Sequence, residues 1–173
     1  MGEYCYRYPH PAVTTDCVVF GYDGLKLNVL LIERGGEPYK DCWAFPGGFL
    51  NIDEDAPDGA RRELLEETGL QITDIEQLGA FATPDRDPRE RVISIAYFTL
   101  TRVQDVAGGD DARVARWFPI DKLPPLAFDH QQMFEQALQR LSGCLKLKTG
   151  NFFSADFSYE ETDMIYFATL NKR

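Results

Sequence analysis

The sequence predicts a single α/β domain in which one β-sheet is covered by helices. Three observations carry this prediction. The 173 residues, 44% hydrophobic and 13% aromatic, are enough to bury one core. Segments with β patterns alternate along the chain with two segments that have helical patterns. One β segment has apolar residues on both faces, as a central strand covered on two sides would. We find no internal repeat and no linker long enough to divide the chain.

The first two strands are predicted to form a hairpin. Residues 13–20 (VTTDCVVF) alternate on one face, and residues 26–33 (KLNVLLIE) form a second β-rich run. Asp23-Gly24 between them is a hairpin turn signal. A loop with Gly35, Gly36 and Pro38 follows.

The next segment, CWAFPGGF, ends in two glycines. Pro46-Gly47-Gly48 allows tight turns and a close approach of main-chain groups to a ligand. A helix is then predicted from about residue 56 to residue 68. Asp55 is placed to cap this helix, Pro57 suits its first turn and Gly69 stops it.

Two further strands are predicted at residues 75–83 and 91–100, and the second of these is the one with two apolar faces. The segment VAGGDDA is a loop, and residues 114–120 (VARWFPI) form a short strand. Trp43 and Trp117 lie in or beside strands, where packing in the core is the default role.

A second helix is predicted from Asp129, because apolar residues fall on one stripe and Gly143 follows them. This helix is expected to cover the sheet. In the tail, residues 164–170 (MIYFATL) are apolar and β-prone, so we expect an edge strand there. Pairing across a dimer and lining the substrate cleft are the alternatives.

The charge balance limits the partners. The chain has 18 basic and 28 acidic residues and a net charge of -10, which opposes binding to nucleic acid or to an anionic membrane. A small anionic substrate remains compatible if divalent cations or local arginines neutralise it. The sequence has no secretory signal and no membrane span, so we expect a cytoplasmic protein. Its four scattered cysteines are expected to be reduced.

The first predicted helix concentrates carboxylates on one side. Glu63, Glu66 and Glu67 stand at i, i+3 and i+4, so they converge. Such a cluster repels itself unless a hard divalent cation such as Mg²⁺ lies between the carboxylates. Glu54 in the preceding loop could complete the site, and Arg62 could orient a carboxylate. The plain alternative is a solvated acidic helix with Glu-Arg pairs.

The full spacing decides between these alternatives. The residues read G-x5-E-x7-R-E-L-x-E-E-x-G-L, which fixes nine positions between Gly48 and Leu70. This pattern resembles the Nudix box without a departure. The resemblance implies a mixed β-sheet sandwiched between helices, with a Nudix domain at residues 12–142, an N-terminal segment at 1–11 and a packed extension at 143–173. It implies hydrolysis of a nucleoside diphosphate linked to another moiety.

The resemblance also implies roles for the box residues. The positions of Glu63, Glu66 and Glu67 bind Mg²⁺, with Mn²⁺ as the alternative ion, and act with Arg62 in catalysis. The position of Gly47 offers its carbonyl to the metal, and Glu54 supports the site. The general base stays open between Glu63, Glu67 and a residue of a downstream loop.

Substrate choice lies outside the box. The segment TPDRDPRERVISIAYFTL resembles ADP-ribose pyrophosphatases, and so does GGDDARVARWFPIDKLPPLAFDH. The first segment supplies candidate substrate contacts: arginines for phosphates or ribose hydroxyls, aspartates for ribose hydroxyls and aromatic rings for adenine. These candidates are Arg86, Arg89 and Arg91, then Asp85 or Asp87, then Phe81, Tyr97 or Phe98. An ordinary charged loop and core aromatics are the alternatives.

Four other polar residues receive simpler expectations. Asp110 and Asp111 lie in a Gly-rich loop that could close over the site, where they would act in catalysis or position a water, but a solvated turn is the favoured interpretation. His10 and His130 are expected to be surface or helix-capping residues rather than catalysts.

Three functions remain open at this point. The resemblance favours an ADP-ribose pyrophosphatase that gives AMP and ribose 5-phosphate. The second is a hydrolase of another nucleotide sugar, a dinucleotide or an oxidised nucleoside triphosphate. The third is a non-catalytic ADP-ribose sensor, since similar domains occur in transcription regulators. Against the sensor, only about thirty residues follow the domain and the box retains every acidic ligand. A homodimer is a family-level expectation.

Overall fold

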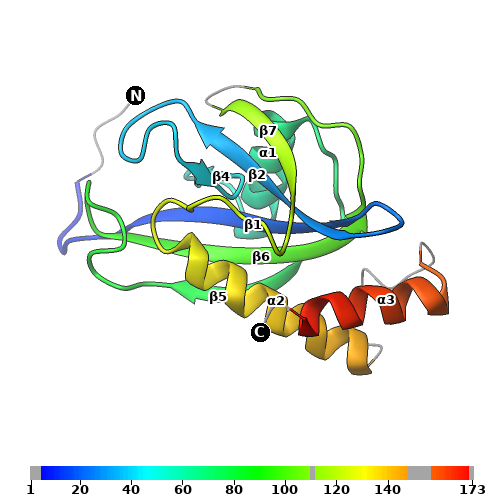
Figure 1. Ribbon diagram of the computed structural model, residues 1–173. Helices are drawn as coiled ribbons and strands as arrows, with labels where there is room; N and C mark the ends of the chain where they lie inside the picture. The colour runs from blue at the N-terminus through cyan, green and yellow to red at the C-terminus, as the bar shows by residue number, and fades with distance from the viewer. Residues whose placement is uncertain (1–4, 110–111, 148–156, 172–173) are drawn as a thin grey trace.

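The computed structural model describes residues 5–109, 112–147 and 157–171. Its centre is a seven-stranded sheet with the order β3-β2-β1-β6-β5, in which β4 pairs with β1 and β7 pairs with β2 (Figure 1). The strands are β1 Ala12–Tyr22, β2 Leu27–Arg34, β3 Trp43–Ala44, β4 Gly47–Phe49, β5 Glu76–Phe81, β6 Val92–Arg102 and β7 Ala112–Pro119. The helices are α1 Ala56–Thr68, α2 His130–Leu147 and α3 Tyr159–Leu170.

The predicted hairpin and central strand are confirmed. β1 and β2 pair antiparallel, and Gly24 in their turn has a φ of 95°, a conformation that glycine adopts without strain. β6 lies between β1 and β5. It pairs parallel with β1 and antiparallel with β5, so the sheet is mixed.

Helices cover both faces of the sheet. On one face Phe20 and Phe98 belong to a core cluster with Phe134 of α2. On the other face Val19 belongs to a second cluster with Leu64 of α1. Figure 1 shows α2 and α3 in front of the sheet and α1 behind it. The fold is therefore the α/β sandwich that the Nudix resemblance implies.

α1 begins and ends where the sequence predicts, but its first turn is capped differently. Asp55 is the N-cap residue, yet its side chain makes no capping hydrogen bond. Its backbone carbonyl instead accepts from the N–H groups of Asp58 and Gly59. Gly69 ends the helix in the left-handed region, with φ of 71°, and its N–H donates to the Leu65 carbonyl.

α2 is longer than predicted. Gly143 was expected to follow the helix, but it lies inside α2, which continues to Leu147. The helix continues because Cys144 and Leu145 beyond the glycine are buried in the core, and this burial outweighs the weak helix propensity of one glycine. The domain boundary expected at residue 142 thus falls within a helix.

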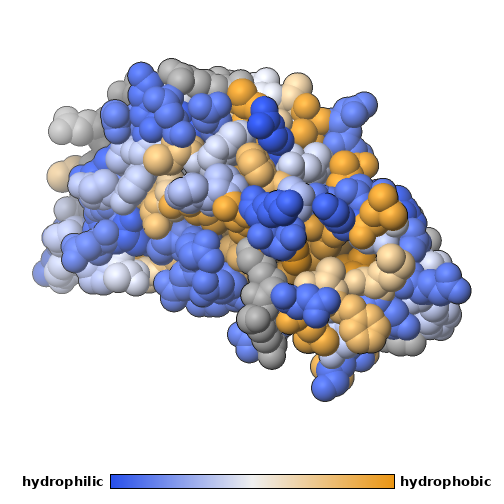
Figure 2. Space-filling view, in the orientation of Figure 1, coloured by the Kyte–Doolittle hydropathy of each residue, from blue (hydrophilic) through white to orange (hydrophobic). Residues whose placement is uncertain are grey.

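The edge strand expected in the tail is wrong, because the segment forms α3. Ser158 and Glu161 make a capping box at its start, in which each side chain bonds the other's backbone N–H. Ile165 is fully buried in the core cluster that α2 also joins. Three large apolar side chains of α3 remain exposed, those of Tyr159, Met164 and Phe167, and Figure 2 shows apolar surface interspersed with polar surface at this end of the molecule.

Within the described ranges, no helix is long and apolar enough to cross a bilayer. Cys5, Cys17, Cys42 and Cys144 are all free thiols.

Candidate active site

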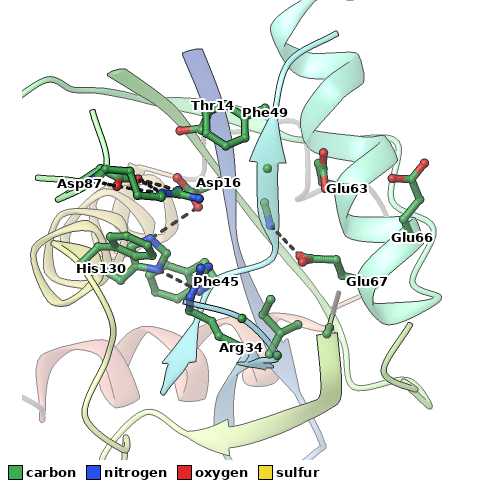
Figure 3. Close-up of a pocket in the computed structure, with 18 of the residues that line it drawn as sticks. Thr14, Asp16, Arg34, Phe45, Phe49, Glu63, Glu66, Glu67, Asp87 and His130 are labelled. Carbon is green, nitrogen blue, oxygen red and sulfur yellow. Dashed lines mark hydrogen bonds and ion pairs between the residues drawn. The ribbon is translucent and has the colours of Figure 1, made fainter. Parts of the chain in front are cut away.

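A cavity of about 730 Å³ opens where β1, β2, β4, α1 and the start of α2 meet (Figure 3). The segment that links β5 to β6 forms one wall. The residues that line the cavity include Thr14, Asp16, Arg34, Phe45, Gly47, Gly48, Phe49, Arg62, Glu63, Glu66, Glu67, Arg86, Asp87, Arg89, Phe128 and His130.

The two glycines of the PGG segment let β4 lie tightly between β1 and α1. A Cβ atom at Gly47 would lie 2.2 Å from the Thr15 carbonyl oxygen, and one at Gly48 would lie 2.5 Å from the carboxylate of Glu63. Neither position therefore admits a side chain without a shift of its neighbours. The glycines bring the main chain directly against the box glutamates.

Arg62 is the centre of the carboxylate cluster. Its Nε and Nη2 donate to the two carboxylate oxygens of Glu54 at 2.7 and 2.8 Å. Its Nη1 donates to Glu63 at 2.7 Å and to Glu66 at 3.0 Å. The hydrogen bonds from Arg62 lower the pKa of Glu54, and those carboxylates in turn raise the pKa of Arg62. The guanidinium thus holds together side chains that would otherwise repel one another.

Glu67 has a different environment. It is 6% exposed and accepts a hydrogen bond of 2.9 Å from the Gly47 N–H. Burial raises the pKa of Glu67 to about 8, and burial also raises the pKa of Glu63. At Glu63 burial outweighs the opposing effect of the Arg62 hydrogen bond on the pKa, and at Glu67 it outweighs that of the Gly47 hydrogen bond.

The donor set fits a hard divalent cation. Its ligands are carboxylate oxygens, which Mg²⁺ and Mn²⁺ favour, and burial of Glu63 and Glu67 leaves negative charge that a cation would stabilise. In the part of the chain that is described, no three acidic, histidine or cysteine side chains are arranged to hold an ion as they stand. Arg62 bonds one carboxylate oxygen each of Glu63 and Glu66 in this arrangement. Glu66 is the more accessible of the two, since its side chain is 42% exposed and that of Glu63 is 15% exposed.

The structure brings three of the expected substrate residues to the cavity. Arg86 forms a bidentate ion pair with Asp129, at 2.7 and 2.9 Å. Arg89 pairs with Asp87 and lies over the ring of Phe49, 5.3 Å from its centroid. These two arginines therefore reach the cavity with their charges already partnered.

Other expected substrate residues lie elsewhere. Arg91 donates to the Ala82 carbonyl, Asp85 is exposed, and neither lines the cavity. Phe81, Tyr97 and Phe98 are buried in the two core clusters. Their rings serve the core, which was the alternative to stacking on adenine. Asp110 and Asp111 lie outside the described residues. The residue before them, Gly109, donates its N–H to the Glu67 carbonyl of α1.

His130 is not at the surface, as one of the two expectations for it had it. It is 3% exposed and lines the cavity at the first residue of α2. Its Nδ1 accepts a 3.0 Å hydrogen bond from the Phe45 N–H, and its Nε2 lies 3.5 Å from Asp16, which also accepts from Ser94. Burial lowers the pKa of His130. His10, by contrast, is exposed and stacks on the ring of Tyr6.

Arg34 and Phe128 are cavity residues that sequence reasoning missed. The Arg34 guanidinium lies over the Phe128 ring, 4.8 Å from its centroid. Phe128 has a φ of 52°, in the left-handed region that a bulky residue rarely adopts. The one signal in the sequence was a cation at the end of a buried strand, directly before Gly35-Gly36.

Comparison with known proteins identifies the family. The NUDIX domain model matches residues 10–137, which include the carboxylate helix, the PGG segment and the start of α2. The chain belongs to the Nudix family and is a Nudix hydrolase, as the box indicated.

Particular relatives are similar over most of the chain. An ADP-ribose pyrophosphatase of Methanocaldococcus jannaschii is 38% identical over 79% of this chain and 78% of its own. A MutT/nudix family protein of Enterococcus faecalis superposes with a TM-score of 0.85 at 31% identity, over 97% of this chain and 77% of that one. The NUDIX domain of Shewanella oneidensis NrtR, crystallised with ADP ribose, gives a TM-score of 0.74 at 33% identity, over 78% and 90% of the two chains.

Proposed function

We propose that this protein hydrolyses the diphosphate of ADP-ribose to AMP and ribose 5-phosphate with the help of Mg²⁺ or Mn²⁺. The observation that carries the proposal is the cavity in which the box glutamates of α1 face the wall formed by Arg86, Asp87 and Arg89. Similarity to an ADP-ribose pyrophosphatase and to a domain crystallised with ADP ribose supports this substrate.

Different residues of the cavity would bind the metal, position the carboxylates and act as the general base. Glu63, Glu66 and Glu67 would hold the metal, with Gly47 beside Glu67. When bound, divalent cations supply charge neutralisation for the diphosphate and acidify a coordinated water. Arg62 would keep Glu54, Glu63 and Glu66 in place through its hydrogen bonds. Glu63 and Glu67 remain the two box candidates for the general base, because both carboxylates line the cavity in which the substrate would lie.

The wall opposite α1 would orient the substrate. The Arg86–Asp129 pair ties this wall to α2, and the side chain of Arg86 is 4% exposed. Asp87 accepts from the backbone N–H and the guanidinium of Arg89, so it would position that arginine at the substrate. Phosphoryl transfer depends mainly on positioning and on stabilising charge, so this set of side chains is sufficient without a covalent nucleophile.

The proposal is tested by ADP-ribose hydrolysis with and without Mg²⁺, with AMP and ribose 5-phosphate separated and counted. We expect Glu66→Gln to lower kcat roughly 100-fold or more, because it removes a charged metal ligand from the site. Glu135→Gln is the matched control, since Glu135 is an exposed glutamate of α2 outside the cavity. Wild-type activity that ignores Mg²⁺ or survives Glu66→Gln unchanged would refute the assignment of the box.

A substrate panel tests the other half of the proposal. Catalytic efficiency should be highest for ADP-ribose among nucleotide sugars, dinucleotides and oxidised nucleoside triphosphates. A preference for a triphosphate would keep the hydrolase and remove ADP-ribose as its substrate.

A sensor is the second candidate, because the similarity to NrtR reaches a domain that holds ADP ribose in its crystal. Tight binding of ADP-ribose without turnover in saturating Mg²⁺ would favour it. The retained carboxylate cluster favours the enzyme. For the enzyme we further propose a cytoplasmic location, a small-molecule substrate and no nucleic acid partner. We also propose a homodimer, which analytical sedimentation would detect.

A further inference from the structure

The chain changes its neighbour in the sheet between β3 and β4. β3 pairs with β2, whereas β4 pairs with β1. Phe45 and Pro46 lie between these two short strands, and we call this pair of residues the switch point. Gly47 follows directly, and its N–H donates to the Glu67 carboxylate at 2.9 Å. The conformation of the switch point therefore determines how Gly47 meets the helix that carries the box.

The main-chain groups of the switch point are bonded by residues from elsewhere in the chain. Pro46 has no N–H, and its carbonyl accepts from the N–H of Cys17 in β1 at 2.9 Å. The N–H of Phe45 donates instead to a side chain, at 3.0 Å from Nδ1 of His130. Phe45 is 1% exposed, and a buried N–H without an acceptor is costly. The imidazole of His130 thus stabilises this conformation of the switch point.

His130 reaches the switch point from a segment that runs beside β3. Trp43 and Leu126 form an isolated parallel bridge, and the N–H of Ala127 donates to the Trp43 carbonyl at 2.8 Å. The N–H of His130 then donates to the Ala127 carbonyl at 3.2 Å, at the start of α2. The histidine ring therefore continues, by a side-chain bond, the main-chain pairing that ties α2 to this part of the sheet.

The ring of His130 is fixed in one orientation. It stacks on the ring of Phe45, with centroids 5.3 Å apart and planes 13° from parallel. Burial lowers the pKa of His130, which favours the neutral ring, and a neutral ring whose Nδ1 accepts carries its proton on Nε2. Nε2 lies 3.5 Å from the carboxylate of Asp16, which Ser94 also bonds. The acceptor nitrogen is thus kept directed at the Phe45 N–H.

The same contacts continue to the box. Asp16 pairs with Gly47 across β1 and β4, and a Cβ atom at Gly47 would lie 2.7 Å from the Asp16 carboxylate. Figure 3 shows His130 and Asp16 on one side of β4 and Glu67 on the other side. Gly47 is therefore held by the His130 side of the cavity while its N–H bonds a box glutamate.

We propose that His130 is a positioning residue for the metal site. By accepting from the Phe45 N–H it fixes the switch point, and it thereby places Gly47 against the box helix. Residues outside the ligand set that hold ligands in place change metal affinity roughly 10- to 100-fold when they are replaced. This inference rests on the proposed function for its metal.

Two substitutions separate the acceptor atom from the rest of the ring. His130→Asn keeps an acceptor, because the amide oxygen of asparagine is attached to Cγ as Nδ1 is in histidine. His130→Leu keeps apolar bulk and has no acceptor. Hydrogen exchange of the Phe45 amide in EDTA, followed by NMR, measures the bond itself. We expect exchange to become roughly tenfold faster or more in His130→Leu and to stay near the wild-type rate in His130→Asn.

The effect on the metal site is measured by titrating the full chain with Mn²⁺ in the absence of substrate, with free Mn²⁺ followed by electron paramagnetic resonance. We expect His130→Leu to raise the Kd for Mn²⁺ roughly tenfold or more, and His130→Asn to stay within about threefold of the wild type. His130→Gln replaces His130→Leu if the leucine variant does not fold, since its longer side chain carries the amide away from the Nδ1 position.

Met133→Ala is the control for loss of stability alone. Met133 is a buried core residue of α2, three positions after His130, and it lies outside the cavity. We expect this variant to unfold at a lower temperature, because it leaves a cavity in the core, and to keep the wild-type Kd for Mn²⁺. Thermal unfolding shows whether each variant is folded.

The outcomes separate this inference from the proposed function. A tenfold rise in the Mn²⁺ Kd of a folded His130→Leu, restored in His130→Asn, supports the role of His130 even if the wild type fails to hydrolyse ADP-ribose. A Kd for His130→Leu within twofold of the wild type overturns the inference even if ADP-ribose is hydrolysed. An equal rise in Met133→Ala also overturns it, because the effect would then follow from stability and not from the Phe45 bond.

Discussion

Glu67 illustrates how one buried carboxyl group couples the proposed metal site to the stability of the folded protein. Its pKa is raised to about 8 from an ordinary value of 4.5, so the folded protein binds a proton there more tightly than the unfolded chain does. By linkage, this group makes the folded state less stable as pH rises from about 4.5 to about 8. Metal-free protein at pH 7.5 therefore carries an unfavourable interaction that a cation would remove.

We expect Glu67→Gln to raise the free energy of unfolding of metal-free protein at pH 7.5 by roughly 1–3 kcal/mol, because a neutral amide avoids the cost of a buried charge. Urea denaturation in EDTA measures this difference, which should shrink towards pH 4.5, the ordinary value for a glutamate. Added Mg²⁺ should stabilise the wild type and not the variant. A variant less stable than the wild type at pH 7.5 would contradict this account.

At the residue scale, sequence reasoning succeeded where partners are close along the chain. The spacing of Glu63, Glu66 and Glu67 is a property of one helix, and the helix period alone brings them together. His130 was misjudged because its partner Phe45 is 85 positions away, and no local pattern reports such a contact. Arg34 was missed for the same reason, since Phe128, whose ring lies against its guanidinium, belongs to a loop far away in the sequence.

Elements were predictable when a residue pattern and a terminator agreed. α1 has apolar residues, Pro57 and Gly69 in consistent positions, so its ends were found. α3 was mistaken for a strand because residues 164–170 are β-prone. Their conformation is set instead by packing and by the Ser158–Glu161 capping box, which was a readable signal before an apolar run.

The docking of α3 gives a prediction at this scale. Glu161 accepts hydrogen bonds from Arg102 of β6 at 2.8 and 2.9 Å, and these bonds with Arg102 lower the pKa of Glu161 to about 2. A lowered carboxyl pKa stabilises the folded state above pH 4.5 and loses its effect as pH falls towards 2. We expect Glu161→Gln to lower the urea midpoint at pH 7, with the deficit narrowing below pH 4.5.

Glu160→Gln serves as its control, because Glu160 is an exposed neighbour in the same first turn. Equal midpoints for Glu161→Gln and Glu160→Gln at pH 7 would show that the Arg102 pair contributes nothing measurable, as many exposed ion pairs do.

For the whole molecule, charge separates the two candidate functions. The net charge of -10 opposes a polyanion, while the cavity has arginines in its lining that a small anion could meet. We expect fluorescence anisotropy at about 0.15 M salt to show ADP-ribose binding and no saturable binding to a short DNA duplex. Saturable duplex binding that ADP-ribose reverses would favour the sensor over the enzyme.

The glycines at Gly47 and Gly48 also bear on how readily this site could evolve. The wall on the α1 side is made of main chain packed against carboxylates, and it has no room for a new side chain. The opposite wall is made of side chains, including those of Arg34 and Phe128. Differences in substrate choice among related proteins are therefore expected to arise on the β2 and α2 side, where a substitution changes the lining of the cavity without displacing main chain.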